Sequence, residues 1–359
     1  MFQPCGNTAG SSQLSFKMKA WQIHHTTEII EGARPLVLVE LPDPVPGPEE
    51  VLIRISVCGV CHTELDEIEG RTPPSVFPMI PGHQVVGRIE RTGEGPCRYA
   101  PGDRVGVAWI YSSCGNCDYC QHHLENLCSE FKATGRDHPG GYAEYMIARQ
   151  DFCFPIPSSF EDNKAAPLFC AGAIGYRSLN LTGISNGMTL GLAGFGASAH
   201  LVMKMVSYKY PDTKVFVFAR SEKELSFARE LGAAWCGNFD SVPPSRVDAV
   251  IDTTPAWKPV IRSLAVLKPG GRLVINAIRK ESRDLDALQQ ISYPEHLWME
   301  KEIKSVANVT RNDVSEFLNF AGQAHILPET EDYSFMDANQ ALIDLKQGKS
   351  RGAKILLMT

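Results

Sequence analysis

Segments typical of buried strands alternate with segments typical of helices over the second half of the sequence. Residues 188–192 and 214–218 are short apolar runs, as expected of strands covered on both faces in a parallel sheet. The segment between them carries apolar residues at the i, i+3, i+4, i+7 spacing of one helix face: Ala199, Val202, Met203 and Val206. A second helix is expected at residues 221–231, and further strands at residues 247–251, 271–276 and 303–307. This alternation predicts an α/β domain with a doubly wound parallel sheet.

A turn rich in small residues joins the first of these strands to its helix. It comprises Gly191, Ala193, Gly194, Phe195 and Gly196, with alanine at the middle position of a Gly-x-Gly-x-x-Gly pattern. Small side chains let the backbone approach a pyrophosphate group, which then lies at the N-terminus of the helix. The alternative is a plain tight turn. Because a strand precedes the turn, and a helix and a second strand follow it, we expect a dinucleotide site.

The end of the second strand bears on the choice of dinucleotide. Chains that bind NAD commonly place a carboxylate there, where it binds the ribose hydroxyls. Here the sequence runs Ala219, Arg220, Ser221, with no acid at the strand end. A guanidinium group would instead pair with the 2′-phosphate of NADP. The alternative is an ordinary solvated arginine, and we expect NADP to be favoured over NAD.

Short apolar runs broken by proline and glycine fill the early part of the chain. Those at residues 36–41, 51–57, 85–91 and 104–108 predict strands. Several short strands at this spacing indicate a small β-barrel or sandwich. With 359 residues, the chain is long enough to hold this domain and the parallel-sheet domain together.

A candidate metal site begins at Cys61, and His83 follows after a Pro- and Gly-rich stretch that is suited to turning the chain back. A thiolate and an imidazole suit zinc, but a catalytic zinc usually takes three protein ligands and leaves one position open. A third ligand is therefore expected elsewhere. Cys170 lies in the apolar segment 165–173, where a lone cysteine is more often a buried structural thiol.

A second metal site is indicated by four cysteines within a short segment. They are Cys114, Cys117, Cys120 and Cys128. Four thiolates can close a tetrahedral structural zinc site, with no position open for chemistry. The alternative, four unrelated cysteines, does not explain their spacing.

Composition excludes some classes of function. The net charge of −6 gives no basic surface for nucleic acid, and no apolar run approaches the ~20 residues of a membrane-spanning helix. Residues 1–17 are polar and lack the apolar core of a secretory signal, so we expect a flexible extension. The cysteine count of 11 is odd, which fits metal sites in a reducing compartment better than a disulfide framework. We expect a cytoplasmic protein.

These motifs, in this order, resemble the zinc-dependent alcohol dehydrogenases of the medium-chain dehydrogenase/reductase superfamily. The resemblance includes Gly-Val-Cys61-His62-Thr63, Pro-Gly-His83, the four-cysteine segment, Cys170-Ala-Gly and the nucleotide turn. It implies a GroES-like β-barrel catalytic domain over residues 18–171 and 310–359. A Rossmann cofactor domain over residues 172–309 would interrupt it, with the active site between the two.

The resemblance also implies roles for single residues. Cys170 becomes the third ligand of a catalytic zinc, His62 contacts the cofactor pyrophosphate, and Thr63 takes the proton of the substrate. Trp109 and Ile110 fall where the family lines its substrate pocket. Three positions depart from the family pattern. Gln84 stands where a glutamate is common, Asp66 where a histidine ends the proton relay, and Ala353 where an arginine binds phosphate, with Arg351 as a possible substitute.

The implied reaction is the reversible oxidation of an alcohol to an aldehyde or ketone, by hydride transfer to NAD(P). Two zinc ions per chain and a homodimer or homotetramer are expected, with a small alcohol or aldehyde as substrate. Two alternatives stay open. The chain could act on polyols or be another zinc-containing member of the superfamily, or it could bind zinc and nucleotide without turnover.

Overall fold

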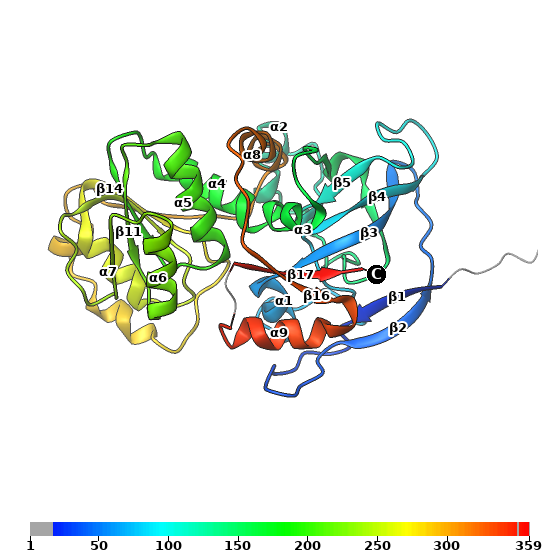
Figure 1. Cartoon of the computed structure of the whole chain (residues 1–359), viewed down its shortest axis with the longest axis horizontal. Coiled ribbons are helices and arrows are strands. Elements are labelled where there is room, and N and C mark those ends of the chain that lie inside the picture. Colours follow the sequence, from blue (N-terminus) through cyan, green and yellow to red (C-terminus); the bar gives the residue numbers. More distant parts are fainter. Residues whose placement is uncertain (1–16, 350–351, 359) are drawn as a thin grey trace, which may run out of the picture.

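The computed structural model describes residues 17–349 and 352–358. The chain forms two domains side by side, which Figure 1 shows with the parallel-sheet domain on the left. The extension expected at the start of the chain lies, apart from its last residue, outside the described residues. Within the described ranges, no helix combines the length and the apolar character needed to cross a membrane.

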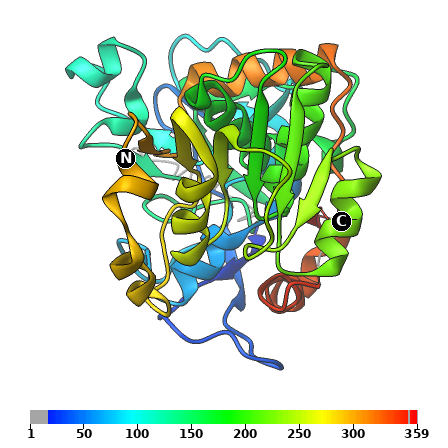
Figure 2. The same ribbon diagram turned by 90° about the vertical axis from the view of Figure 1, so that its left-hand side faces the viewer.

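The parallel-sheet domain contains a six-stranded sheet in the order β12-β11-β10-β13-β14-β15, with every neighbouring pair parallel. Its strands are β10 (Thr189–Ala193), β11 (Lys214–Phe218), β12 (Trp235–Gly237), β13 (Val247–Asp252), β14 (Leu267–Ile275) and β15 (Glu302–Ser305). Figure 2 looks onto this domain and shows the strands side by side with helices around them. The predicted doubly wound parallel sheet is confirmed. The short strand β12 was not predicted.

Helices cover both faces of this sheet. They are α4 (Ala171–Thr182), α5 (Ala197–Lys209), α6 (Glu222–Glu230) and α7 (Lys258–Val266), with the short helices η4 (Leu285–Gln290) and η5 (Tyr293–Leu297) before β15. Strand β11 shows why both faces need cover. Val217 belongs to the apolar cluster that contains Val202 of α5, whereas Phe218 belongs to the cluster that contains Leu264 of α7. Alternate residues of a strand point to opposite faces of the sheet, so a continuous apolar run needs helices packed on both faces.

The other domain, here the mixed-sheet domain, is built on strands from both ends of the chain. Its main sheet runs β16-β17-β3-β4-β5-β9, and β8 pairs with β3 outside this path. The strands are β3 (Glu50–Val60), β4 (Val85–Thr92), β5 (Arg104–Val107), β8 (Tyr145–Arg149), β9 (Cys153–Pro155), β16 (Thr330–Ser334) and β17 (Ala353–Leu357). Two smaller pairs flank it, β1 (Lys17–Gln22) with β2 (Val37–Pro42), and β6 (Ile110–Ser112) with β7 (Lys132–Ala133).

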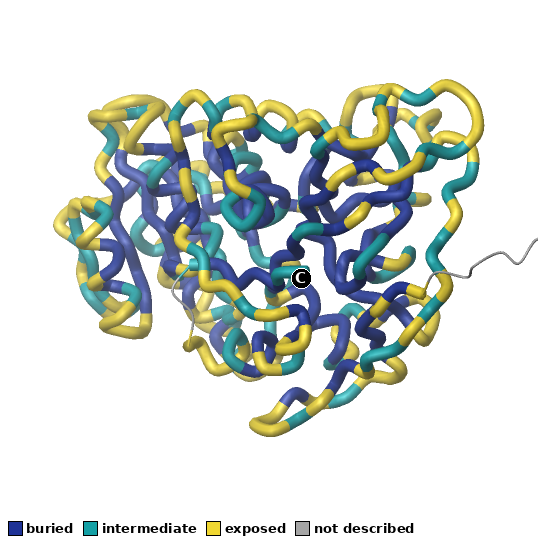
Figure 3. Tube along the Cα trace, turned by 45° about the vertical axis from the view of Figure 1, so that its right-hand side comes forward, coloured by how far each residue is buried: buried dark blue, intermediate teal, exposed yellow. Residues whose placement is uncertain are grey.

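Helices of this domain are mostly short. They are α1 (His62–Ile68), α2 (Asp118–Gln121), α3 (Asp162–Ala165), α8 (Arg311–Gln323), α9 (Ala338–Lys346), η1 (Glu125–Leu127), η2 (Gln150–Phe152), η3 (Ala166–Phe169) and η6 (Phe335–Asp337). Buried residues lie in the interior of both domains, whereas exposed residues gather on the outer loops (Figure 3). Helix α8 packs against α4, where a Cβ added to Gly172 would come within 2.2 Å of the Phe317 ring. This close packing joins the two domains.

Candidate active site

Cys61, His83 and Cys170 meet between the two domains, although they come from three separate parts of the chain. Cys61 follows β3 and caps α1, whereas Cys170 lies between η3 and α4. His83 follows Gly82, which has φ of 99° and no room for a Cβ against the Tyr142 ring. The three ligand atoms lie within 4.8 Å of one another. Cys61, His83 and Cys170 therefore form one group in the fold, the three-ligand group.

A buried carboxylate orients the histidine of this group. Oε1 of Glu64 lies 2.7 Å from Nδ1 of His83, and neither side chain is exposed. The other oxygen of Glu64 accepts a hydrogen bond from the Cys61 backbone N–H at 2.7 Å. When Nδ1–H donates to Glu64, Nε2 keeps its lone pair for a metal. Glu64 was not predicted, although its place three residues after the cap Cys61 is the spacing of a capping box.

The geometry and charge of the group fit a divalent cation. Sγ of Cys61 lies 3.6 Å from Nε2 of His83. A sulfur and a nitrogen on one tetrahedral zinc lie roughly 3.6 Å apart. A hydrogen bond with Cys170, together with burial, raises the pKa of the Cys61 thiol well above its usual value. Burial alone would lower the pKa of His83, but the charges of Cys61 and Glu64 raise it well above its usual value. A cation bound by all three residues would offset the repulsion among the negative charges of Cys61, Cys170 and Glu64.

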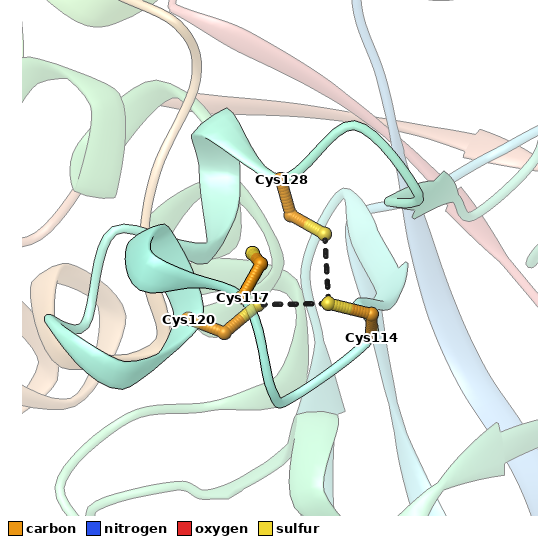
Figure 4. A group of neighbouring side chains, drawn as sticks. All are labelled: Cys114, Cys117, Cys120 and Cys128. Carbon is orange, nitrogen blue, oxygen red and sulfur yellow. Dashed lines mark hydrogen bonds between the residues drawn. The ribbon is translucent and has the colours of Figure 1, made fainter.

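The second cysteine group forms a compact cluster beside α2. The four sulfurs of Cys114, Cys117, Cys120 and Cys128 lie within 4.8 Å of one another. Figure 4 shows the four side chains gathered together. Sγ of Cys114 is 3.9 Å from that of Cys120 and 3.6 Å from that of Cys128. Sulfurs on one tetrahedral zinc lie roughly 3.8 Å apart, so this set also fits zinc.

The segment that carries these cysteines contacts residues 307–311, where the chain passes from the parallel-sheet domain back to the mixed-sheet domain. Oε1 of Glu125 accepts hydrogen bonds from the backbone N–H and the Nε of Arg311, at 2.7 and 3.1 Å. Nδ2 of Asn126 donates to the carbonyl of Ala307 at 2.8 Å. The cysteine cluster therefore lies in a segment that contacts the second of the two connections between the domains.

Residues next to the three-ligand group lie on α1 or beside β3. His62 is exposed and Thr63 is nearly buried in the first turn of α1, directly after Cys61. Gln84 is buried, and a Cβ added to Gly59 would come within 2.8 Å of its side chain. Of the two candidate residues near the end of the chain, Ala353 is buried at the start of β17, and Arg351 lies outside the described residues.

Asp66 is engaged in ion pairs. Its Oδ1 accepts a hydrogen bond from Nε of Arg71 at 2.7 Å. The same oxygen lies 2.7 Å from Nη2 of Arg279, which belongs to the other domain. Asp66 therefore interacts with two arginines, Arg71 and Arg279, and the sequence predicted neither contact.

Trp109 and Ile110 are buried in a small apolar cluster with Ala133 and Phe152. The guanidinium group of Arg136 lies over the Trp109 ring, 5.4 Å from its centre. The indole Nε1 of Trp109 is buried and has no hydrogen-bond partner among the described residues. A ligand in contact with this cluster would meet an aromatic surface and one free donor.

The predicted nucleotide turn links β10 to α5. Gly194 has φ of 84°, and a Cβ there would come within 2.7 Å of Thr253 Oγ1. A Cβ added to Gly196, the cap of α5, would meet open space. The hydroxyl of Ser198 in the first turn of α5 is buried without a partner among the described residues. Free backbone N–H groups and this hydroxyl fit a phosphate at the helix N-terminus.

The segment after β11 places charge at the edge of the same sheet. Ala219 is buried, whereas Arg220 is exposed and forms no ion pair with another described residue. Ser221 caps α6, and Glu224 is bound to it in a capping box. Glu222 pairs with Arg229. Both neighbouring acids are thus engaged within their own helix, and Arg220 is not.

Comparison with known proteins finds one family over most of the chain. Residues 47–158 match a family model described as the alcohol dehydrogenase GroES-like domain. The chain is 38% identical over 346 residues to a probable alcohol dehydrogenase, AdhA, of Mycobacterium tuberculosis, covering 95% of this chain and 97% of the relative. It is 30% identical over 334 residues to an alcohol dehydrogenase of Geobacillus stearothermophilus, covering 90% and 96%.

Solved structures show the same arrangement of domains. A thermostable alcohol dehydrogenase of Pyrobaculum aerophilum with bound cobalt and zinc superposes with a TM-score of 0.84 at 23% identity, covering 96% of this chain and all of that one. A structure described as CAD from Helicobacter pylori, complexed with NADP(H), gives a TM-score of 0.82 at 22% identity, covering 95% and 98%. At these identities the likeness concerns the fold.

Proposed function

The chain belongs to the zinc-dependent alcohol dehydrogenases of the medium-chain dehydrogenase/reductase superfamily and is an oxidoreductase of alcohols, and we propose that its active site is the group Cys61, His83 and Cys170. The observation that carries this proposal is the meeting of these three residues from separate parts of the chain, with Glu64 orienting His83. The reaction is the reversible oxidation of an alcohol to an aldehyde or ketone, with a hydride passed to NAD(P).

The residues around this group bind the substrate and move its proton. Zinc held by Cys61, His83 and Cys170 would supply a Lewis acid, which would make an alcohol hydroxyl easier to deprotonate. Thr63, two residues after Cys61, accepts the proton of the substrate hydroxyl while its own hydroxyl proton passes to water. Trp109 and Ile110 line the pocket for the carbon chain, and the buried Gln84 keeps a neutral amide next to His83.

The cofactor lies across the carboxyl edge of the parallel sheet, in the Rossmann domain of residues 172–309. The turn from Gly191 to Gly196 takes the pyrophosphate, which His62 contacts from the other domain. Ala219, Arg220 and Ser221 face the adenosine ribose, and NADP is favoured over NAD. Support comes from the ion pairing of this segment, because Glu222 and Glu224 are held elsewhere and Arg220 is exposed.

Two zinc ions are bound per chain. The second is structural and is held by the four-cysteine cluster, whose sulfur spacing supports a tetrahedral site. Use of six cysteines as metal ligands favours a reducing compartment, and we place the protein in the cytoplasm.

The chain forms a homodimer or a homotetramer. Strand β15 is the edge of the parallel sheet, and all four of its residues are exposed. Large apolar side chains are exposed around it, among them Trp298, Met299 and Ile303. An exposed edge with apolar surroundings suits pairing with the same edge of a second copy about a two-fold axis.

The test is an activity screen of primary alcohols, secondary alcohols, polyols and aldehydes, each with NAD and with NADP. Zinc content is measured on the same sample. Cofactor reduction by simple alcohols is expected. A strong preference for polyols would instead support a polyol dehydrogenase, and full zinc content without any turnover would support a non-catalytic binding protein.

A further inference from the structure

Arg279 makes a contact across the two domains. It follows β14, at the carboxyl edge of the parallel sheet, and its Nη2 lies 2.7 Å from Oδ1 of Asp66 on α1. The side chain of Asp66 is only 5% exposed and that of Arg279 is 19% exposed, so the pair is largely shielded from water. The guanidinium group is therefore held against the helix that carries His62 and Thr63.

A second nitrogen of the same guanidinium group is left without a partner. Nε of Arg279 is buried and has no hydrogen-bond acceptor among the described residues. A buried donor on a charged group is costly to leave unpaired. An acceptor supplied by a bound ligand would satisfy it.

Position on the sheet indicates which part of a dinucleotide could supply this acceptor. Ligands of doubly wound sheets bind along the carboxyl ends of the strands. The adenosine ribose is assigned to the end of β11, and β14 lies three strands away in the order β11-β10-β13-β14. At about 4.8 Å per strand this is roughly 14 Å. Arg279 thus faces the half of the dinucleotide beyond the adenosine, near the three-ligand group.

The loop that carries Arg279 is held in place before any ligand arrives. Nζ of the neighbouring Lys280 donates to the Thr254 carbonyl at 2.7 Å and forms an ion pair with the buried Asp252. Asp284, at the other end of the loop, accepts hydrogen bonds from the backbone N–H groups of Trp257 and Lys258, at 2.9 and 2.8 Å. A loop fixed at these points loses little entropy when it binds a ligand.

We propose that Arg279 is a cofactor-binding residue that Asp66 holds in place, and that its Nε–H donates a hydrogen bond to the bound dinucleotide. The acceptor is an oxygen of the pyrophosphate or of the ribose that follows it. This inference rests on the proposed function, since it requires that the parallel-sheet domain binds a dinucleotide. Arg279 would then make two contacts, one with Asp66 of the other domain and one with the bound cofactor.

Binding of cofactor fragments tests this without any turnover. Titration calorimetry compares the zinc-loaded protein with the variants Arg279→Ala and Arg279→Lys, using NADP, ADP-ribose, ADP and AMP. A charge-assisted hydrogen bond predicts a roughly tenfold loss of affinity for NADP and ADP-ribose, and no loss for AMP. Arg279→Lys keeps a cation for Asp66 but has no Nε–H, so we expect a comparable loss. A loss that already occurs with ADP assigns the acceptor to the phosphate, and one that first occurs with ADP-ribose assigns it to the ribose.

The matched control is Arg283→Ala. Arg283 lies in the same loop, is 87% exposed and pairs with Glu281 in that loop, so its removal should leave all four affinities unchanged. Equal loss for AMP in the Arg279 variants, or no loss for any ligand, overturns the inference while the proposed function stands. A wild-type protein that binds none of the dinucleotides overturns both.

Discussion

Nδ1 of His83 lies 2.7 Å from Oε1 of Glu64, and both side chains are fully buried. The two residues belong to different elements, because Glu64 lies on α1 and His83 follows the Gly82 turn before β4. Glu64 also binds the backbone N–H of Cys61. One carboxylate therefore orients a histidine ligand and fixes the start of the helix at a cysteine ligand.

Removing this carboxylate should weaken metal binding at the three-ligand group. Partners of this kind are worth roughly 10–100-fold in metal affinity, so Glu64→Gln should lose one zinc to a competing chelator before the other. The measurement is zinc content against chelator concentration. Glu67→Gln is the control on the same helix. Burial raises the pKa of Glu67 well above its usual value, which favours the neutral form, and glutamine has a similar shape without a charge. Equal zinc retention in both variants would contradict the orienting role.

The two zinc sites should separate in their effects on activity and stability. His83→Ala should abolish turnover and lose one zinc while the fold stays largely intact. Cys117→Ser should lose the other zinc and lower the melting temperature first, because a structural zinc contributes free energy of folding. Metal analysis and thermal unfolding of both variants check this. One zinc per chain in the wild-type protein would be incompatible with two sites.

Thr63 should carry most of the proton transfer. Thr63→Ala should lower kcat by roughly 10²–10⁴, whereas Thr63→Ser keeps the hydroxyl and should retain most of the activity. Asp66 stands where a histidine ends the relay in many members of the family, but its Oδ1 already accepts a hydrogen bond from Arg71 and forms an ion pair with Arg279. We therefore expect Asp66→Asn to leave the pH profile of kcat unchanged, with water completing the relay. A shifted pH profile of kcat in Asp66→Asn would instead mean that Asp66 accepts the proton at the end of the relay.

Cofactor choice should follow the segment after β11. With alanine at 219 and a free guanidinium at 220, kcat/KM should be higher with NADP than with NAD, by about tenfold for one charge-assisted bond. Ala219→Asp combined with Arg220→Ile should reverse the preference. Lys223→Ile, on the exposed first turn of α6, is the control and should change little. Equal or better turnover with NAD in the wild-type protein would mean that Arg220 does not reach the cofactor.

His200 on α5 should make the stability depend on pH. Burial lowers its pKa from 6.5 to about 4. Its Nδ1 faces the Gly196 carbonyl and its Nε2 accepts from the Glu329 N–H, contacts that a neutral ring satisfies. The unfolded chain binds the proton first, so this stability is fully present above pH 6.5 and is lost as the pH falls towards 4. The loss is at most about 3 kcal/mol.

Urea unfolding at several pH values checks this contribution. His200→Gln should lose part of the acid dependence of the unfolding free energy between pH 6.5 and 4. His25→Asn, at an exposed histidine, should keep all of it. Identical acid dependence in wild type and His200→Gln would contradict the assignment.

Periodicity and spacing were enough for much of the fold and for the grouping of the four cysteines. The apolar run at residues 214–218 is β11, because a strand buried on both faces leaves a continuous apolar signal. The helix expected at residues 221–231 is α6, which Ser221 caps. The four cysteines needed only a short loop to meet. Cys170 could not be recognised from its surroundings, and only the family resemblance indicated its role as a ligand.

Contacts between distant parts of the chain could not be predicted in this way. Nothing near Asp66 indicates that Arg279 will reach it, because their contact depends on how the two domains meet. The same holds for Glu64 and His83, whose pairing requires the turn at Gly82. Helix α1 was missed as well, since seven residues are too few to show a helical period.

The pairing of β17 with β3 has a consequence for synthesis on the ribosome. Ile355 lies opposite Gly59, so the strand that leads into Cys61 gains this neighbour only when the last strand has been made. All strands of the parallel sheet precede α8 and are complete by then. Domains fold as units during synthesis. A nascent chain should therefore carry a folded cofactor domain before its zinc-binding domain can close, and ribosome-stalled chains ending before β17 should bind dinucleotide yet show no turnover.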